Sequence, residues 1–421
     1  MTVATTAEEP KQEQPPGGRA ARRRRRSSVN LAEASGGRRD RNNFDMLRLF
    51  AATCVVFGHS FDLLAVREPF PNLGGDLTWG FVGVLIFFSI SGFLVSRSWA
   101  RNPRLLPFAL KRALRLMPGL LVAVLLSALV LGPLLSTEPL HLYLRDPATK
   151  TYVLNNALLQ SDFALPGVFS HNTIVGAVNG SLWTLPLEVK AYAILALLGL
   201  LGLLTRWRRA MPIVAALGVA ACATALRPSL PLADHLGAAL VDIQAAPGVV
   251  HQVAVGTYNV YIEMFAAFAV GAALYGIRDW VLLRWDLAAL AAAGIVAAAF
   301  ARGPWPDLAC VTLAPYLVLC LAYRTAAYVR LPRWFGDYSY GVYVYAYPAQ
   351  QTIVQLLGPH SGWILFLVAM PVTFGLAVLS WHFVERPALD LKTRITGGER
   401  PPGEADGPSP IADRTAVGMR I

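Results

Sequence analysis

The chain has 421 residues, of which 55% are hydrophobic and only 15% charged, and its mean hydropathy is +0.47. Soluble domains carry about 25% charged residues, so this composition argues against an ordinary soluble enzyme. The net charge of +11 does not predict a nucleic-acid partner, because much of it lies in an N-terminal tail with an arginine run at 22–26. We interpret that run as a topology anchor that touches anionic lipid, with a specific partner as the alternative.

The apolar segments predict the fold class. About 20 predominantly apolar residues cross a bilayer as a helix, and ten segments of this kind occur, at 44–65, 79–99, 114–135, 182–204, 210–226, 257–277, 285–301, 307–323, 338–357 and 362–384. The chain is therefore predicted to be an all-α membrane protein with about ten transmembrane helices. Lys and Arg concentrate in the loops on the side of the N-terminal tail, so both termini are expected to be cytoplasmic.

The polar ends define the expected domain boundaries. Residues 1–43 are predicted to be a disordered basic cytoplasmic tail, and residues 388–421 a cytoplasmic C-terminal tail that is mostly disordered. Residues 44–387 then form the ten-helix membrane domain, with its largest outer loops at 136–181 and 227–256. The four cysteines fall in apolar stretches without zinc spacing, so we expect buried thiols and no metal site.

The first predicted helix carries charges at membrane depth, where ionisable groups are costly and often functional. Arg48 and His59 are eleven residues apart, which places them on one helix face about 16 Å apart along the axis. Asp45 can pair with Arg48 from one turn away. His59 suits general-base work, because an imidazole titrates near neutral pH. The alternatives are a snorkelling anchor for Arg48 and a satisfied polar residue for His59.

Two carboxylates are expected at the depth of His59. Glu188 and Glu263 each lie about six residues into a predicted helix, counted from the outer side, as does His59. A carboxylate beside an imidazole fixes its tautomer and stabilises the imidazolium. Packing, or the lining of a water-filled vestibule, is the alternative role for both carboxylates.

A basic cluster is expected at the cytoplasmic face. Lys111, Arg112 and Arg115 lead into the third predicted helix, and Arg112 and Arg115 point one way because they are three residues apart. Together with Arg48 they could form a forked-donor site for phosphates. The alternative is that these residues only set the topology.

Six segments in order resemble the acyltransferase 3 family of membrane O-acyltransferases. The resemblance runs from residue 44 to about 387. Its segments are Asp45-x-x-Arg48-x10-His59, GVLIFFSISGFL at 83–94, KRALRLMP at 111–118, GSLWTLPLE at 180–188, YSYGVY at 338–343 and FVERP at 383–387. Each segment alone is weak, but six in order on ten predicted spans are specific.

The resemblance implies an acyltransferase of the class that transfers groups other than aminoacyl groups. Such an enzyme takes an acyl group from cytoplasmic acyl-CoA, and acetyl is the commonest acyl group in the family. The acceptor would be a hydroxyl of a carbohydrate, a lipid-linked sugar or a small metabolite. His59 would be the catalytic base and Glu188 would orient His59 or the acceptor. Arg48, Lys111, Arg112 and Arg115 would hold the donor, with Arg48 also near the reacting thioester. The glycines of the second helix would let the pantetheine arm approach the backbone.

The sequence departs from the family pattern in the ninth helix. Many members have a His before its Pro, whereas here Tyr347 precedes Pro348, so no second catalytic His is expected. Gln351 could contact a sugar instead, and Asp45 and Glu263 are further candidates for substrate binding. The SGNH domain of many members is not recognised, which favours an exopolysaccharide, lipo-oligosaccharide or small-molecule acceptor. We expect a bacterial inner-membrane location.

A polytopic transporter of a sugar or lipid-linked substrate is the main alternative, since it also explains buried carboxylates and helices interrupted by Pro and Gly. A catalytically silent scaffold that binds sugars or lipids is the other. The transferase hypothesis requires one continuous polar path between the arginines and His59.

Overall fold

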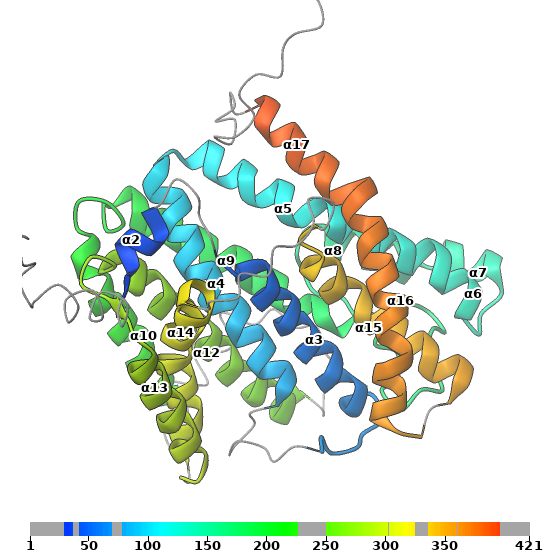
Figure 1. Ribbon diagram of the computed structural model, residues 1–421. Coiled ribbons are helices and arrows are strands. Elements are labelled where there is room, and N and C mark those ends of the chain that lie inside the picture. Colours follow the sequence, from blue (N-terminus) through cyan, green and yellow to red (C-terminus); the bar gives the residue numbers. More distant parts are fainter. Residues whose placement is uncertain are drawn as a thin grey trace, which may run out of the picture.

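The computed structural model describes residues 29–36, 42–69, 78–225, 250–301, 303–324, 336–358 and 360–395. These residues form a bundle of long helices, with one sheet of two short strands, β1 (Val29–Asn30) and β2 (Leu282–Leu283) (Figure 1). The long helices are α3 (Phe44–Asp62), α4 (Trp79–Arg101), α5 (Leu105–Leu126), α9 (Thr184–Leu200), α10 (Met211–Ala225), α12 (Val250–Gly276), α13 (Trp285–Ala299), α14 (Trp305–Arg324), α15 (Ser339–Leu357) and α16 (Gly362–Ser380).

Short elements complete the described chain. They are α2 (Leu31–Gly36), the π-helical turn η1 (Ser127–Leu131), α6 (Gly132–Leu135), α7 (Leu140–Arg145), α8 (Pro147–Ala157), the 3-10 turns η2 (Gly180–Trp183) and η3 (Arg208–Ala210), the π-helical turn η4 (Trp381–Glu385) and α17 (Arg386–Ile395).

Each of the ten apolar segments predicted to cross the membrane is helical for most of its length. Among the described residues, six helical segments are long and apolar enough to cross: Phe44–Asp62, Trp79–Arg101, Leu105–Leu135, Gly180–Leu200, Trp305–Arg324 and Gly362–Leu391. Val260–Gly276 and Trp285–Ala299 are shorter apolar helices. The all-α class is confirmed and the apolar helices indicate an integral membrane protein. The count of ten spans and the cytoplasmic side of both termini stay predictions.

The two predicted tails are partly structured. Val29 and Asn30 pair antiparallel with Leu283 and Leu282, and Leu31 is fully buried, so residues 29–36 are folded against the bundle rather than disordered. At the other end, α17 continues the chain as helix to Ile395 (Figure 1). The remaining tail predictions, and much of the outer loop at 227–256, lie outside the described residues.

Glycines of α4 are used for helix packing. A Cβ on Gly83 would lie 2.4 Å from the carbonyl oxygen of Ala51 in α3, and one on Gly92 would lie 2.0 Å from that of Phe268 in α12. Only glycine permits such close backbone approach. The expectation that these glycines admit the pantetheine arm is therefore wrong for Gly83 and Gly92, because neighbouring helices already fill the space.

The chain between α8 and η2 folds into the bundle. Phe169 and Val178 in this segment are fully buried, and Asn179 donates from Nδ2 to the carbonyl oxygen of Val344 over 2.9 Å. Irregular backbone is tolerated at membrane depth where protein surrounds it. As a result α9 begins inside the bundle, which decides where Glu188 lies.

Candidate active site

A cavity of about 230 Å³ with a cluster of charged residues in its lining lies among α3, α4, α5, α9, α15 and α17. Its charged lining residues are Arg48, Lys111, Arg112, Arg115 and Glu188. The structure thus brings all four predicted donor-binding cations to one cavity, together with one of the two predicted carboxylates. Aromatic residues of α4 and α15 line much of the remaining wall.

Arg48 is held by two carboxylates. Its Nη1 lies 3.8 Å from Oδ1 of Asp45, which confirms the pairing predicted from their spacing, and 3.4 Å from Oδ2 of Asp337. The Arg48 side chain is 24% exposed and lines the cavity. Its position in the cavity does not fit the alternative of an anchor snorkelling into lipid headgroups.

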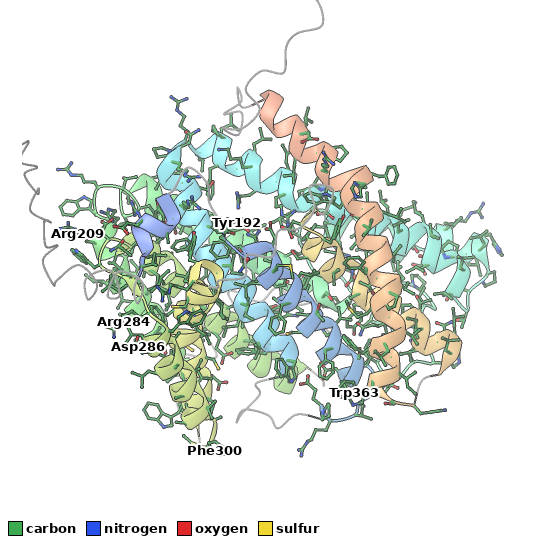
Figure 2. All side chains as sticks on the ribbon, viewed as in Figure 1. Tyr192, Arg209, Arg284, Asp286, Phe300 and Trp363 are labelled. Carbon is green, nitrogen blue, oxygen red and sulfur yellow. The ribbon has the colours of Figure 1, made fainter. Side chains whose placement is uncertain are left out.

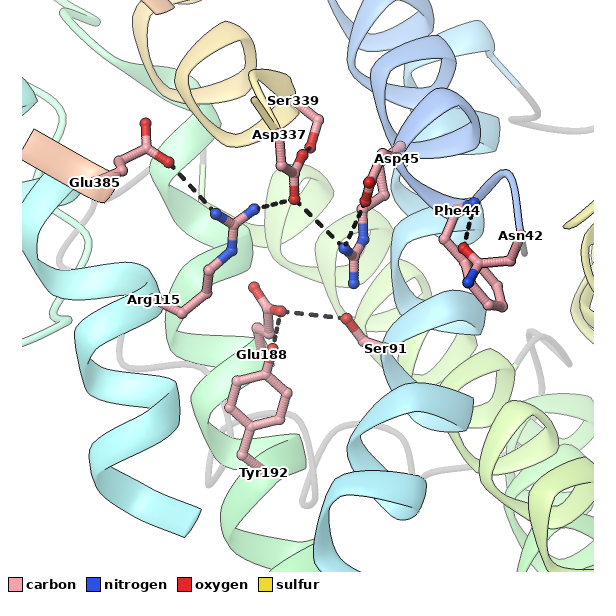
Figure 3. A network of polar contacts seen from close by, with 11 residues as sticks. Asn42, Phe44, Asp45, Ser91, Arg115, Glu188, Tyr192, Asp337, Ser339 and Glu385 are labelled. Atoms are coloured by element: carbon pink, nitrogen blue, oxygen red, sulfur yellow. Dashed lines mark hydrogen bonds and ion pairs between the residues drawn. The ribbon is translucent and has the colours of Figure 1, made fainter. Parts of the chain in front are cut away.

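Arg115 also pairs with Asp337, the acid that Arg48 contacts. Its Nη2 lies 2.6 Å from Oδ2 of Asp337, and its Nη1 lies 3.5 Å from Oε2 of Glu385 (Figure 3). Ser339 donates to the other oxygen of Asp337. Burial alone would raise the pKa of Asp337, but the Arg115 and Arg48 guanidinium groups outweigh that effect and hold the pKa below its ordinary value. Asp337 therefore stays ionised and fixes both arginines.

Lys111 and Arg112 differ from this pair, because neither forms an ion pair with a carboxylate in the described part of the chain. The Arg112 Nε is buried and has no hydrogen-bond partner there. Its guanidinium carbon lies 5.7 Å from the centre of the Tyr192 ring, a cation–π contact. The cavity thus presents two cations that have no carboxylate partner in the described chain, which suits a phosphate-bearing ligand.

Glu188 lies at the level of the arginines, not of His59. Its Oε1 accepts hydrogen bonds from the hydroxyls of Tyr192 and Ser91, the latter over 3.3 Å (Figure 3). No hydrogen bond joins it to His59 among the described residues. The predicted depth is wrong because it was counted from the outer surface, whereas α9 begins inside the bundle. Figure 2 shows Tyr192, its partner, in the middle of the molecule.

His59 is partly buried on α3 and packs edge-on against Tyr347 of α15, with ring centroids 5.1 Å apart. Its Nδ1 is buried and has no hydrogen-bond partner within the described ranges. The described lining of the cavity does not include His59. The expected polar path between the arginines and His59 is therefore not continuous in this conformation.

The two remaining predicted substrate contacts lie away from the cavity. Glu263 is buried in α12, which packs against α4 and α10. Gln351 is fully buried; its Nε2 donates to the carbonyl oxygens of Ile174 and Ala177, and its Oε1 accepts from Asn172. In place of the expected sugar contact, Gln351 ties the inward-folded segment to α15.

Four residues of the site were not predicted from the sequence, namely Asp337, Ser91, Tyr192 and Ser339. The sequence did contain a signal for Asp337, since this residue directly precedes the YSYGVY segment. It is also acidic in a predicted cytoplasmic loop, where the membrane topology depends on basic residues only. Ser91 and Ser339 lie inside segments that carry the family resemblance. Tyr192 follows Glu188 by one helical turn, a spacing that allows contact but does not single it out.

The fold and cavity define a helical membrane protein with a cationic internal site. The chain belongs to the acyltransferase 3 family, whose acyltransferase domain model matches residues 41–382. It is 31% identical over 373 residues to nodulation protein 10 of Rhizobium leguminosarum bv. viciae, covering 86% of this chain and 96% of that protein.

The chain is also similar to the O-acetyl transferase of Shigella phage Sf6, at 29% identity over 348 residues, 82% of this chain and 95% of the phage protein. No solved structure matches. The family and these relatives support a membrane O-acyltransferase.

Proposed function

We propose that the protein transfers an acyl group from cytoplasmic acyl-CoA to a hydroxyl of a carbohydrate, a lipid-linked sugar or a small metabolite. Acetyl, the commonest acyl group in the family, is the proposed group. The observation that carries the proposal is the charge arrangement of the cavity. Lys111 and Arg112 lack carboxylate partners in the described chain, whereas Arg48 and Arg115 are held by Asp337. The family match favours this function over the transporter and scaffold alternatives.

The two kinds of cation suit two parts of the donor. Lys111 and Arg112 are suited to bind CoA phosphates, since neither has a carboxylate partner in the described chain. The guanidinium group of Arg112 can in addition bind phosphate oxygens with two parallel hydrogen bonds. Arg48 and Arg115 already share Asp337, so they are suited to hold the thioester end in a fixed position. This division is finer than the prediction from the sequence, in which the four residues hold the donor and Arg48 also lies near the thioester.

His59 is proposed as the general base. It takes the proton of the acceptor hydroxyl as that oxygen attacks the thioester carbonyl carbon; the C–O bond forms, the C–S bond breaks, and the CoA sulfur receives the proton. General-base catalysis of this kind contributes about 10²- to 10⁴-fold. Glu188 is not assigned the orientation of His59, because its described partners are Ser91 and Tyr192.

The acceptor class is proposed from the family resemblance, and the names of the relatives are compatible with it. The phage relative is named an O-acetyl transferase and the rhizobial relative a nodulation protein. We propose an exopolysaccharide, lipo-oligosaccharide or related hydroxyl compound as acceptor, and the bacterial inner membrane as location. Mass spectrometry of glycans and metabolites from cells with and without the protein tests the acceptor.

The donor is tested with purified protein and acetyl-CoA. Arg112→Gln and Lys111→Gln should each weaken acetyl-CoA binding about tenfold, as expected for loss of one charged phosphate contact. The matched control is Arg209→Gln, since Arg209 is exposed beside Trp280 at the edge of the molecule (Figure 2). Equal binding by all three variants and the unaltered protein would remove the donor assignment.

A further inference from the structure

The cavity ends one helical turn short of His59 on two helices. On α15, Tyr343 lines the cavity, whereas Tyr347, four residues later, contacts the His59 ring. On α4, Val84 lines the cavity, whereas Gly80, four residues earlier, packs against Gly58, the neighbour of His59. Four helical residues span about 6 Å. A narrow barrier therefore separates the cations from the proposed base.

Two aromatic rings pack against each other near the end of the cavity, and one of them belongs to Tyr343. The rings of Phe87 and Tyr343 lie 5.8 Å apart, edge to face, and both line the cavity. The Tyr343 hydroxyl lies 2.6 Å from the Thr184 hydroxyl and donates to the Ser181 carbonyl oxygen over 2.9 Å. Tyr343 is thus fixed on both sides.

Phe87 is the movable member of the pair. Its side chain has no polar atom that could anchor it, and it is only partly buried, between the core clusters formed by α3, α4 and α15. A rotation of Phe87 would break no hydrogen bond, whereas a rotation of Tyr343 would break two buried hydrogen bonds, which is costly.

We propose that the Phe87–Tyr343 pair determines which acyl chains the enzyme accepts. This inference rests on the proposed function, in which the acyl group is the leading end of a donor held at Lys111 and Arg112. The acyl group must pass between the two rings to reach His59, and each added methylene must fit the same opening. The pair therefore selects short acyl chains.

The test compares CoA release from acetyl-CoA and butyryl-CoA in membrane vesicles of producing cells, with His59→Ala vesicles as background. Phe87→Ala should raise the butyryl-to-acetyl ratio about tenfold or more, as for a pocket that gains room for added methylenes. Phe87→Trp should lower it. Val95→Ala enlarges the same cavity eight residues away on α4 and should leave the ratio unchanged.

The outcomes separate this inference from the proposed function. Absence of His59-dependent CoA release from acetyl-CoA in the unaltered protein contradicts the proposed function. Release with an unchanged ratio in Phe87→Ala overturns the selectivity inference alone, as does an equal change in Val95→Ala. If Phe87→Ala does not reach the membrane, Phe87→Leu should shift the ratio in the same direction, and no shift there overturns the inference. Calorimetric binding of both thioesters to purified protein gives a second readout that needs no acceptor.

Discussion

Arg115 donates from Nη2 to Oδ2 of Asp337 over 2.6 Å and so joins α5 to the segment that begins α15. The same oxygen lies 3.4 Å from Nη1 of Arg48 on α3. Two guanidinium groups that would otherwise repel each other are thereby held by one carboxylate, and both line the cavity; Figure 3 shows Arg115 and Asp337. Asp337 is a positioning residue, since it acts through the arginines.

Replacing Asp337 with Asn should lower kcat/KM for acetyl-CoA about 100-fold. Removal of the acid that both arginines share costs about 3 kcal/mol, because it leaves Arg48 with Asp45 alone and Arg115 with Glu385 alone, both at longer distances. The Asp337 side chain is 12% exposed, so solvent screens this effect only weakly. Steady-state kinetics in vesicles measure the change, and Asp337→Glu should restore part of it. If Asn and Glu variants are equally inactive, the role of Asp337 is structural.

The depressed pKa of Asp337 predicts a pH dependence of stability. The ordinary value is 3.8 and the folded value is lower, so the ionised carboxylate stabilises the folded protein at all pH values above 3.8. That contribution is lost as the pH falls through 3.8 toward the folded value. The difference in thermal midpoint between the unaltered protein and Asp337→Asn should therefore shrink as the pH falls below about 4.

Thermal unfolding of both proteins in detergent at stepped pH measures this difference. A difference that grows on acidification would show that Asp337 is not the ionised partner of the arginines.

The sequence predicted the helices and the cations but not the depth of Glu188. Helical segments are predictable because length and apolarity are local properties, and Arg48 and Asp45 pair as spacing within one helix requires. The depth of Glu188 depends on the irregular chain before η2, whose inward path has no periodic signal. Asp337 was missed for a related reason, since its role exists only when α3, α5 and α15 meet.

Substitutions of His59 and of Arg112 should affect catalysis and donor binding separately. His59 lies outside the described cavity lining, so His59→Ala should reduce turnover about 10²- to 10⁴-fold while leaving the acetyl-CoA dissociation constant unchanged. Arg112→Gln should do the reverse, weakening binding with a smaller effect on turnover at saturation. Calorimetry and vesicle kinetics on the same preparations test both. Equal loss of binding in both variants would show that His59 contacts the donor directly.

Arg48→Ala should abolish acylation while leaving the protein in the membrane. Arg48 both faces the cavity and pairs with Asp45 and Asp337, so its loss removes a donor contact, leaves Asp45 without its cation and leaves Asp337 with Arg115 alone. Acylation in cells is the measurement, with membrane insertion checked on the same samples. Acylation near the level of the unaltered protein would remove Arg48 from the site.

Substitution of Gln351 tests whether this residue, which was predicted to contact a sugar, instead stabilises the fold. Gln351→Ala would leave the carbonyl oxygens of Ile174 and Ala177 without their donor, at a cost of about 1 to 3 kcal/mol. The thermal midpoint should therefore fall by several degrees. Gln355→Ala, one turn along α15 at an exposed position, should change stability by no more than about 0.5 kcal/mol. If Gln351→Ala keeps its thermal midpoint but loses acyl transfer, the side chain leaves its structural partners to bind the acceptor.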